Sequence, residues 1–156
     1  MVAPFGAHFI DKPRCGSALY GIMSSVMERK YLQDIEVKPK PWGKEIWFAW
    51  NPKYAGKILE INKGHRFSLQ YHEKKIETQL IIEGKIKFTF GKDPKNLSEL
   101  IFEAGEKVDI PAKLLHRAEA LEKTIIFEVS TPELEDVVKI EDDYGRKGKG
   151  NNEKMD

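Results

Sequence analysis

Beyond an irregular N-terminal segment, apolar and polar residues alternate with the period of two that is typical of β-strands. Lys85–Phe90 shows this most clearly, because Ile86, Phe88 and Phe90 share one face. The same reasoning predicts further short strands between turn residues, at Glu45–Trp50, Lys57–Asn62, Gln70–His72, Glu77–Glu83, Leu100–Glu103, Lys107–Ile110, His116–Leu121 and Thr124–Ser130. Many short strands of this kind predict an all-β protein, with two sheets arranged as a jelly roll.

The alternation divides the chain into three parts. Residues 1–35 lack it and are predicted to be an N-terminal extension, residues 36–146 a single barrel, and residues 147–156 a disordered tail. The extension can contain one short helix at Ala18–Lys30, and Lys92–Ser98 is predicted to be a solvated loop between strands. Our hypothesis is that the first 26 residues are peripheral to function; the alternative is an arm that packs on the barrel or on a partner subunit.

Composition narrows the possible partners. The 156 residues suit one domain with a hydrophobic core, and 33% are charged, yet the formal net charge is only +1. This balance argues against nucleic acid and against an anionic membrane surface. Cys15 is the only cysteine, which excludes an intramolecular disulfide and a thiolate metal cluster. Neither a secretory signal nor an apolar run of transmembrane length is visible, so we expect a cytoplasmic protein.

Metal-ligating residue types recur at strand spacing in the middle of the chain. Gln70 and His72 are two positions apart and therefore share a face, and Glu77 begins the next predicted strand. His116 begins another strand and completes a set of nitrogen and oxygen donors. We expect these four residues to bind one divalent metal ion. Zinc fits best, and manganese, iron(II), cobalt or nickel fit the same donors; the structural alternative is an empty barrel that retains polar residues inside.

The spacing of these residues resembles that of the cupin family. The first cupin motif, G-x5-H-x-H-x4-E-x6-G, is matched by Gly64, Gln70, His72, Glu77 and Gly84, with glutamine in place of the first histidine. The second motif, G-x5-P-x-G-x2-H-x3-N, is matched in register but departs at two positions, and its residues here are Gly105, Pro111, Lys113, His116 and Ala120. This resemblance implies a cupin double-stranded β-helix.

A narrower resemblance covers about two-thirds of the chain. Several stretches are similar to the cupin domain of type II mannose-6-phosphate isomerases: Lys40–Gly43, Phe67–His72, Ile110–Pro111, His116–Arg117, Glu135–Val138 and Asp142–Arg146. In that group a glutamine usually replaces the first cupin histidine, so Gln70 fits the pattern. The group usually occurs fused to a mannose-1-phosphate guanylyltransferase domain, and the present sequence is expected to be the barrel standing alone.

The resemblance implies a metal-dependent isomerase that interconverts an aldose and a ketose phosphate such as mannose 6-phosphate. The metal polarises the sugar carbonyl, a base moves a proton between C1 and C2, and a cation holds the phosphate. Strand placement makes Glu128, Glu119 and Lys57 candidates for the base. The candidates for binding the phosphate are Arg146, Arg66, Lys75 and Arg117; for each of these groups the alternative is a solvated surface charge.

Departures from the type II pattern keep other functions open. That pattern reads Q-x-H-x-H-R-x-E-H-W. In this chain its second histidine and its arginine are replaced by Lys74 and Lys75, and its final histidine–tryptophan pair is replaced by Thr78 and Gln79. The alternatives are a cupin that binds a sugar or sugar nucleotide without turnover, and a cupin with a different metal-dependent reaction.

The resemblance also implies a homodimer. Trp42, Trp47 and Trp50 are candidates for stacking on sugars, although core or dimer contacts are the commoner use.

Overall fold

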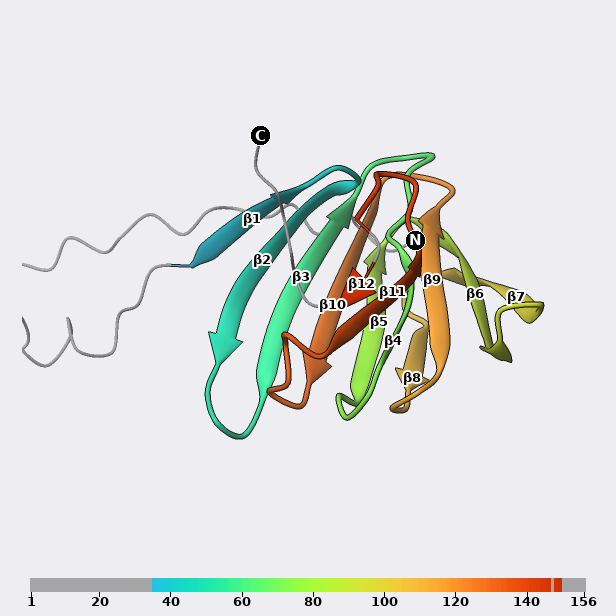
Figure 1. Ribbon diagram of the computed structural model, residues 1–156. Helices are drawn as coiled ribbons and strands as arrows, with labels where there is room; N and C mark the ends of the chain where they lie inside the picture. The colour runs from blue at the N-terminus through green and yellow to red at the C-terminus, as the bar shows by residue number, and fades with distance from the viewer. Residues whose placement is uncertain (1–34, 147, 150–156) are drawn as a thin grey trace, which may run out of the picture. The chain divides into compact units, whose positions relative to one another are not determined.

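The computed structural model describes residues 35–146 and 148–149, whose regular structure is β-strand arranged in two antiparallel sheets (Figure 1). In spatial order, the first sheet contains β1 (Glu36–Lys40), β2 (Gly43–Trp50), β3 (Ala55–Ile61), β10 (Thr124–Ser130), β5 (Glu77–Glu83) and β8 (Lys107–Ile110). The second contains β12 (Gly148–Lys149), β11 (Val137–Glu141), β4 (Leu69–His72), β9 (Leu115–Ala120), β6 (Lys85–Asp93) and β7 (Asn96–Glu103). The described residues contain no helix that is long and apolar enough to span a membrane. The all-β prediction is confirmed.

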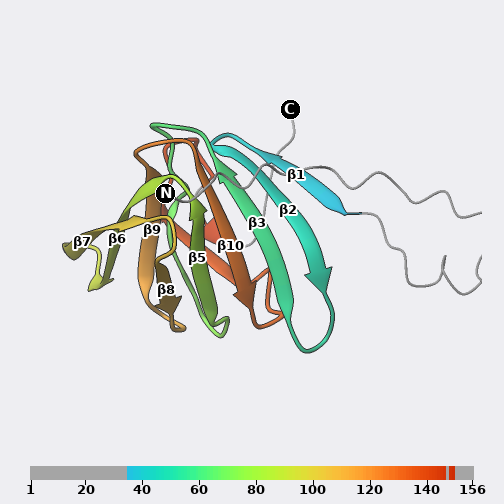
Figure 2. The same ribbon diagram turned by 180° about the vertical axis from the view of Figure 1, so that it is seen from behind.

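The two sheets face each other around one apolar core. Figures 1 and 2 view the barrel from opposite sides, and the sheet that contains β3 and β10 lies nearer the viewer in Figure 2. Ile61, Ile81 and Ile126 point inward from this sheet, and Ile86 and Phe88 meet them from the other, all fully buried. This interdigitation is the main source of stability expected for a jelly roll.

The strand register places a polar row directly beside this core. On β10, Glu128 lies opposite Lys57 of β3 and Gln79 of β5. Two residues earlier on β10, on the same face, Ile126 lies opposite Ile81. One end of the barrel interior is therefore lined by charged and amide groups, while the other is closed by aliphatic side chains.

The segment predicted as a loop, Lys92–Ser98, is mostly strand, and that prediction is wrong. β6 continues to Asp93 and β7 begins at Asn96, so Pro94 and Lys95 alone form the turn. The Asp93 carboxylate accepts a hydrogen bond of 3.0 Å from the Lys95 backbone N–H. Aspartate followed by proline favours a tight turn, and pairing of the two flanking strands extends the hairpin through polar residues.

The ends of the chain are described in part. The predicted N-terminal extension and its helix at Ala18–Lys30 lie outside the described residues, apart from Ile35. Within the tail predicted to be disordered, Gly148–Lys149 instead pair as β12 with Val138 and Lys139 of β11, because the edge of β11 offers free backbone groups. The rest of that tail lies outside the described residues.

Candidate metal centre

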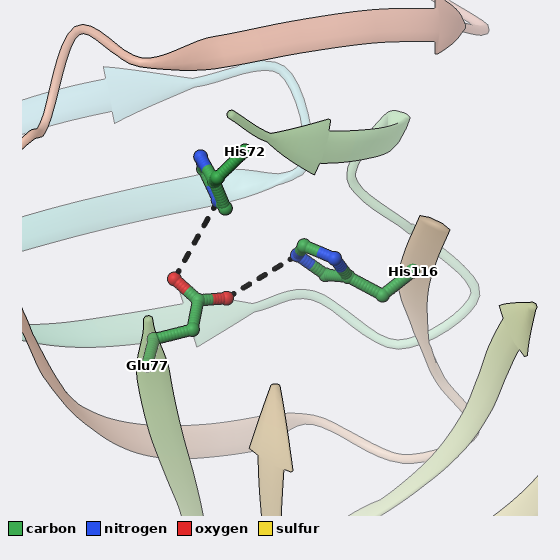
Figure 3. A group of neighbouring side chains, drawn as sticks. All are labelled: His72, Glu77 and His116. Carbon is green, nitrogen blue, oxygen red and sulfur yellow. Dashed lines mark ion pairs between the residues drawn. The ribbon is translucent and has the colours of Figure 1, made fainter. Parts of the chain in front are cut away.

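Two buried histidines lie close together on neighbouring strands of the second sheet and point into the barrel interior (Figure 3). His72 ends β4 and His116 lies on the neighbouring β9, and their ring centroids are 5.5 Å apart. Each ring is fixed by its Nδ1 atom, which lies 2.8 Å from the Asp136 carbonyl oxygen in His72 and 3.0 Å from the Leu114 carbonyl oxygen in His116. A carbonyl oxygen only accepts, so Nδ1 carries the proton and Nε2 of a neutral ring presents a lone pair.

These two Nε2 atoms point at the carboxylate of Glu77, which begins β5 (Figure 3). Nε2 of His72 lies 3.6 Å from Oε2, and Nε2 of His116 lies 3.2 Å from Oε1. Burial lowers the pKa of His72 to about 4, despite the opposing effect of Glu77, so this ring is neutral at pH 7. Neither Nε2 atom has a hydrogen-bond partner among the described residues.

This arrangement fits a bound cation. Three buried acceptors that face one another repel unless a positive charge lies between them, and an unpaired buried nitrogen is costly. One donor atom from each of His72, Glu77 and His116 can be chosen so that all lie within 4.8 Å of one another. The measured spacings are close to the roughly 3.4 Å that separates neighbouring ligands of a tetrahedral ion bound at about 2.0–2.1 Å. Possible metal binding by these three residues is therefore supported.

Gln70, the fourth predicted ligand, lies next to this group. It is paired directly with His116 between β4 and β9, and its side chain is half-buried. The Ser68 hydroxyl donates a hydrogen bond of 2.8 Å to Gln70 Oε1. The amide oxygen is thus held near the histidines, and its role as a ligand stays a prediction.

A cavity is lined by three of the four predicted ligands, Gln70, His72 and Glu77, and by a set of buried charges, whereas His116 lies behind its wall. It is lined by Lys40, Trp42, Glu45, Lys57, Leu59, Phe67, Ser68, Gln70, His72, Lys75, Glu77, Gln79, Glu128, Leu134, Val137, Lys139 and Arg146. The lining combines apolar walls with a few convergent polar groups, which is typical of small-molecule sites.

The most buried lysine of the cavity is Lys75, whose ammonium ion-pairs with Glu77 Oε2 and lies 2.7 Å from Glu128 Oε1. Its side chain is 3% exposed. Burial alone would lower the pKa of Lys75, but Glu128 and Glu77 outweigh burial and raise it. Burial alone would raise the pKa of Glu77, but Lys75 and the histidines hold it well below its usual range. Lys75 therefore ion-pairs with two interior carboxylates and offsets one of their two negative charges. Phosphate binding by Lys75 stays a prediction.

Of the three predicted proton carriers, Glu128 and Lys57 line the cavity. Glu119 lies on the opposite face of β9 from His116, where it ion-pairs with Lys87 at 3.1 Å. Glu128 Oε2 also accepts a hydrogen bond of 3.4 Å from Gln79 Nε2. Lys57 lies 3.8 Å from Glu45 and 4.6 Å from the centre of the Trp47 ring. Glu128 and Lys57 share the site, although each already has partners of its own.

The three arginines that were predicted to bind phosphate lie in different parts of the barrel. Arg146 lines the cavity, where Asp142 holds its guanidinium through Nη2 at 2.8 Å. Arg117 follows His116 on β9 and so points to the opposite face of the sheet, where it lies 3.5 Å from the Glu141 carboxylate. Arg66 pairs with Asp143 at 2.7 Å and is also outside the set of lining residues. Of the three, Arg146 alone is placed to contact a molecule in this cavity.

Sequence reasoning gave no site role to Gln79 and Glu45. Gln79 shares the inward face of β5 with Glu77, a signal that the period of two contains. Glu45 is half-buried on β2; burial raises its pKa, but Lys57 and Lys40 outweigh this and lower it. Its position became evident only from the pairing of β2 with β3, a contact that the local pattern cannot specify.

The chain is similar in sequence to part of a larger enzyme. It is 30% identical over 112 residues to a mannose-1-phosphate guanylyltransferase of Escherichia coli, which covers 69% of this chain and 22% of that protein. A mannose-1-phosphate guanylyltransferase of Salmonella typhimurium, ManC, is 29% identical over the same length. The chain therefore spans about a fifth of the length of the curated relatives it matches.

Solved structures give the fold. KdgF from Halomonas sp. superposes with a TM-score of 0.54 at 16% identity, covering 65% of this chain and 89% of that one. CapF from Staphylococcus aureus superposes with a TM-score of 0.59 at 20% identity, covering 73% of this chain and 34% of that one. These likenesses confirm the cupin barrel. The family described as Mannose-6-phosphate isomerase C-terminal matches residues 27–142. The chain is thus a cupin that belongs to the mannose-6-phosphate isomerase C-terminal family.

Proposed function

We propose that the protein is a metal-dependent aldose–ketose isomerase acting on a sugar phosphate of the mannose 6-phosphate type. The observation that carries the proposal is the convergence of His72 Nε2 and His116 Nε2 on the buried Glu77 carboxylate, where His72 and Glu77 also line a cavity. Membership of the mannose-6-phosphate isomerase C-terminal family supports the substrate class.

His72, Glu77 and His116 would hold the divalent ion, with Gln70 Oε1 available beside them. When bound, the ion supplies a Lewis acid for the carbonyl oxygen of the open-chain sugar. The single carboxylate among these donors leaves the bound ion with net positive charge. The nitrogen and oxygen donors favour zinc and also suit manganese, iron, cobalt and nickel.

The proton between C1 and C2 would be carried by a cavity carboxylate. Glu128 is our first candidate, because its carboxylate is buried in the cavity and is not one of the proposed metal ligands. It would take the proton from one carbon and return it to the other, so that no net proton is consumed. Lys57, opposite Glu128 in the strand pairing, is the second candidate.

Arg146 would bind the phosphate. Its guanidinium lines the cavity and is oriented by two contacts with Asp142, Nε to Oδ2 at 3.2 Å and Nη2 to Oδ1 at 2.8 Å. An oriented guanidinium matches the geometry of phosphate oxygens and loses little entropy on binding them.

One observation favours a second function, a barrel that binds a sugar phosphate or sugar nucleotide without turnover. Lys75 engages both Glu77 and Glu128, so the first candidate for the base is already ion-paired. A different metal-dependent reaction on the same barrel is the third possibility.

The test combines metal content with turnover on one sample. We expect about one equivalent of metal by mass spectrometry, together with conversion of mannose 6-phosphate to fructose 6-phosphate. His116→Ala should lower kcat/KM by at least about a hundredfold and reduce the amount of bound metal. Gln70→Ala should also lower kcat/KM and the amount of bound metal. His65→Ala is the matched control, because the His65 side chain is exposed and its ring lies near the Lys63 carbonyl, away from the candidate metal centre. Stoichiometric metal without turnover would favour the binding module, and absence of metal after reconstitution would contradict the site.

A further inference from the structure

Lys75 contacts the one carboxylate that the candidate metal centre depends on. The Lys75 ammonium and His72 Nε2 both approach Glu77 Oε2, while His116 Nε2 approaches Oε1. Lysine and both histidines are nearly or fully buried. Glu77 therefore has a positive partner already, and this partner belongs to the chain itself.

Lys75 also has a second anion within reach. Glu128 Oε1 lies 2.7 Å from Lys75 Nζ, on the neighbouring strand β10. A lysine ammonium is a point charge on a flexible stem, so it can leave one carboxylate while it keeps the other. Glu128 is in turn held by Gln79 Nε2, which donates to Glu77 Oε1 at 3.2 Å and to Glu128 Oε2 at 3.4 Å. The amide thus connects the two carboxylates that share the lysine.

Electrostatics sets the direction of the effect. An ammonium next to a metal ligand repels a divalent cation at that ligand, and this repulsion is strong where water is excluded. The same ammonium offsets the charge of the two buried carboxylates, which would otherwise be unpaired. Lys75 thus stabilises the interior without an ion and opposes the entry of one.

We propose that Lys75 is a built-in competitor for Glu77: it must release Glu77, and remain with Glu128, before Glu77 can bind a divalent cation. Lys75 would accordingly be a positioning residue that sets metal affinity. This inference rests on the metal centre of the proposed function and is independent of the isomerase reaction.

The experiment measures the dissociation constant of zinc for the full chain by competition with a chromophoric chelator. Lys75→Met removes the competing charge and should tighten zinc binding by about tenfold or more. Glu128→Gln removes the anion that receives the released ammonium and should weaken binding by about tenfold. A lysine that merely supports Glu77 would give the opposite result for Lys75→Met.

Lys40→Met is the matched control for general cavity charge. Lys40 lines the same cavity with a side chain that is 4% exposed, but it lies near a different carboxylate, 3.9 Å from Glu45. We expect its effect on zinc affinity to stay within about threefold, because its charge is not at a proposed ligand. An equal effect of both lysine substitutions would overturn the specific role of Lys75.

The remaining outcomes are also decisive. If the native chain binds no zinc but Lys75→Met does, the competition is supported in its extreme form. Unchanged or weaker binding by Lys75→Met, or absence of binding by both proteins, overturns the inference. If Lys75→Met fails to fold, Glu128→Gln decides alone, since unchanged or tighter binding contradicts the proposal. Zinc binding that follows the expected pattern without isomerase turnover would defeat the proposed reaction and leave this inference standing.

Discussion

At the scale of single residues, the hydrogen bond at Nδ1 of each histidine determines which ring nitrogen can bind a metal ion. The Asp136 and Leu114 carbonyl oxygens fix the Nδ1 proton of His72 and His116, respectively. The Nε2 lone pairs then have a fixed direction, toward Glu77. Metal sites commonly use such carbonyl partners to select the tautomer. The backbone therefore prepares the ligands before any ion arrives.

A pH prediction follows for His72 in the metal-free protein. Its pKa is lowered from 6.5 to about 4, chiefly by burial, so between these values the unfolded chain binds a proton that the folded chain does not. The free energy of unfolding should be unaffected by this group above pH 6.5 and should fall by up to about 3 kcal/mol as the pH drops to 4.

Urea unfolding at a series of pH values measures this loss. The comparison is with His72→Gln, which cannot titrate and should lose less stability across the same range. Parallel curves for the two proteins between pH 4 and 6.5 would contradict a depressed pKa. The difference between the curves is informative because carboxylates that do not interact with His72 contribute equally to both.

The site shows which residues a sequence can and cannot reveal. The spacing of His72, Glu77 and His116 specified a shared interior face, because alternation along strands fixes the direction of side chains. Lys75 was one of four cations expected to bind phosphate, and the sequence placed it in a short polar turn. Its burial depends on Glu128, which is 53 positions away. Contacts across strands of this kind are set by topology, and local patterns do not encode them.

At the scale of elements, Asp136 ties the turn between β4 and β5 to the start of β11. Its carboxylate accepts three backbone hydrogen bonds, from Glu73 at 3.2 Å, Lys74 at 2.5 Å and Lys75 at 3.0 Å. Its own carbonyl oxygen orients His72. One residue thus positions both a candidate ligand and the backbone of the competing lysine.

Asp136→Ala should therefore lower the free energy of unfolding by about 2–3 kcal/mol, because three donors lose a charged acceptor. Burial would raise the pKa of Asp136, but the Lys75, Lys74 and Glu73 N–H groups outweigh it and lower the pKa. Its contribution is consequently present above the ordinary pKa of 3.8 and is lost as the pH falls below it. Urea unfolding measures both effects.

Glu135→Ala is the neighbouring control, since Glu135 is exposed and should change stability by less than about 0.5 kcal/mol. Similar losses for the two variants would mean that the three hydrogen bonds contribute little.

A second element, the turn before β9, carries measurable backbone strain. Lys113 has a φ of 66°, in the left-handed region, at the position where the second cupin motif has glycine. Lys113→Gly should stabilise the protein by about 0.5–1 kcal/mol, since relief of the strain exceeds the added chain entropy. Thermal unfolding tests this. Lys113→Ala retains Cβ and should not stabilise; a gain equal to that of glycine would refute the explanation.

The hairpin of β6 and β7 shows how far element boundaries follow from sequence. Composition predicted a loop over Lys92–Ser98, because lysine, asparagine and serine are typical of turns. In the structure Phe90 pairs with Ser98 and Asp93 with Asn96, so partner strands override local preference. By contrast, the apolar alternation at Lys85–Phe90 specified its strand correctly, because one face is buried in the core.

At the scale of the whole molecule, the outer face of the first sheet is apolar across five strands. Strand register aligns Val37, Ile46, Ile58, Phe127 and Leu80 in one row from β1 to β5. Phe48 stacks on Phe127 with ring centroids 5.1 Å apart and remains 41% exposed. A continuous apolar row of this kind, with no charge inside it, suits a two-fold interface, in which each patch meets its own copy.

We therefore expect a homodimer joined through this face, as the resemblance to cupins implies. Light scattering coupled to size exclusion should give twice the chain mass of 18.0 kDa at micromolar concentration. Phe48→Glu should shift the protein to the monomer, because it places two like charges near the centre of the interface and removes an aromatic contact. Leu100→Glu is the matched control: Leu100 is 52% exposed but lies on β7 of the other sheet. A native protein that is monomeric at every concentration, or a dimer that Leu100→Glu disrupts and Phe48→Glu does not, would place the apolar row outside any interface between copies of this chain.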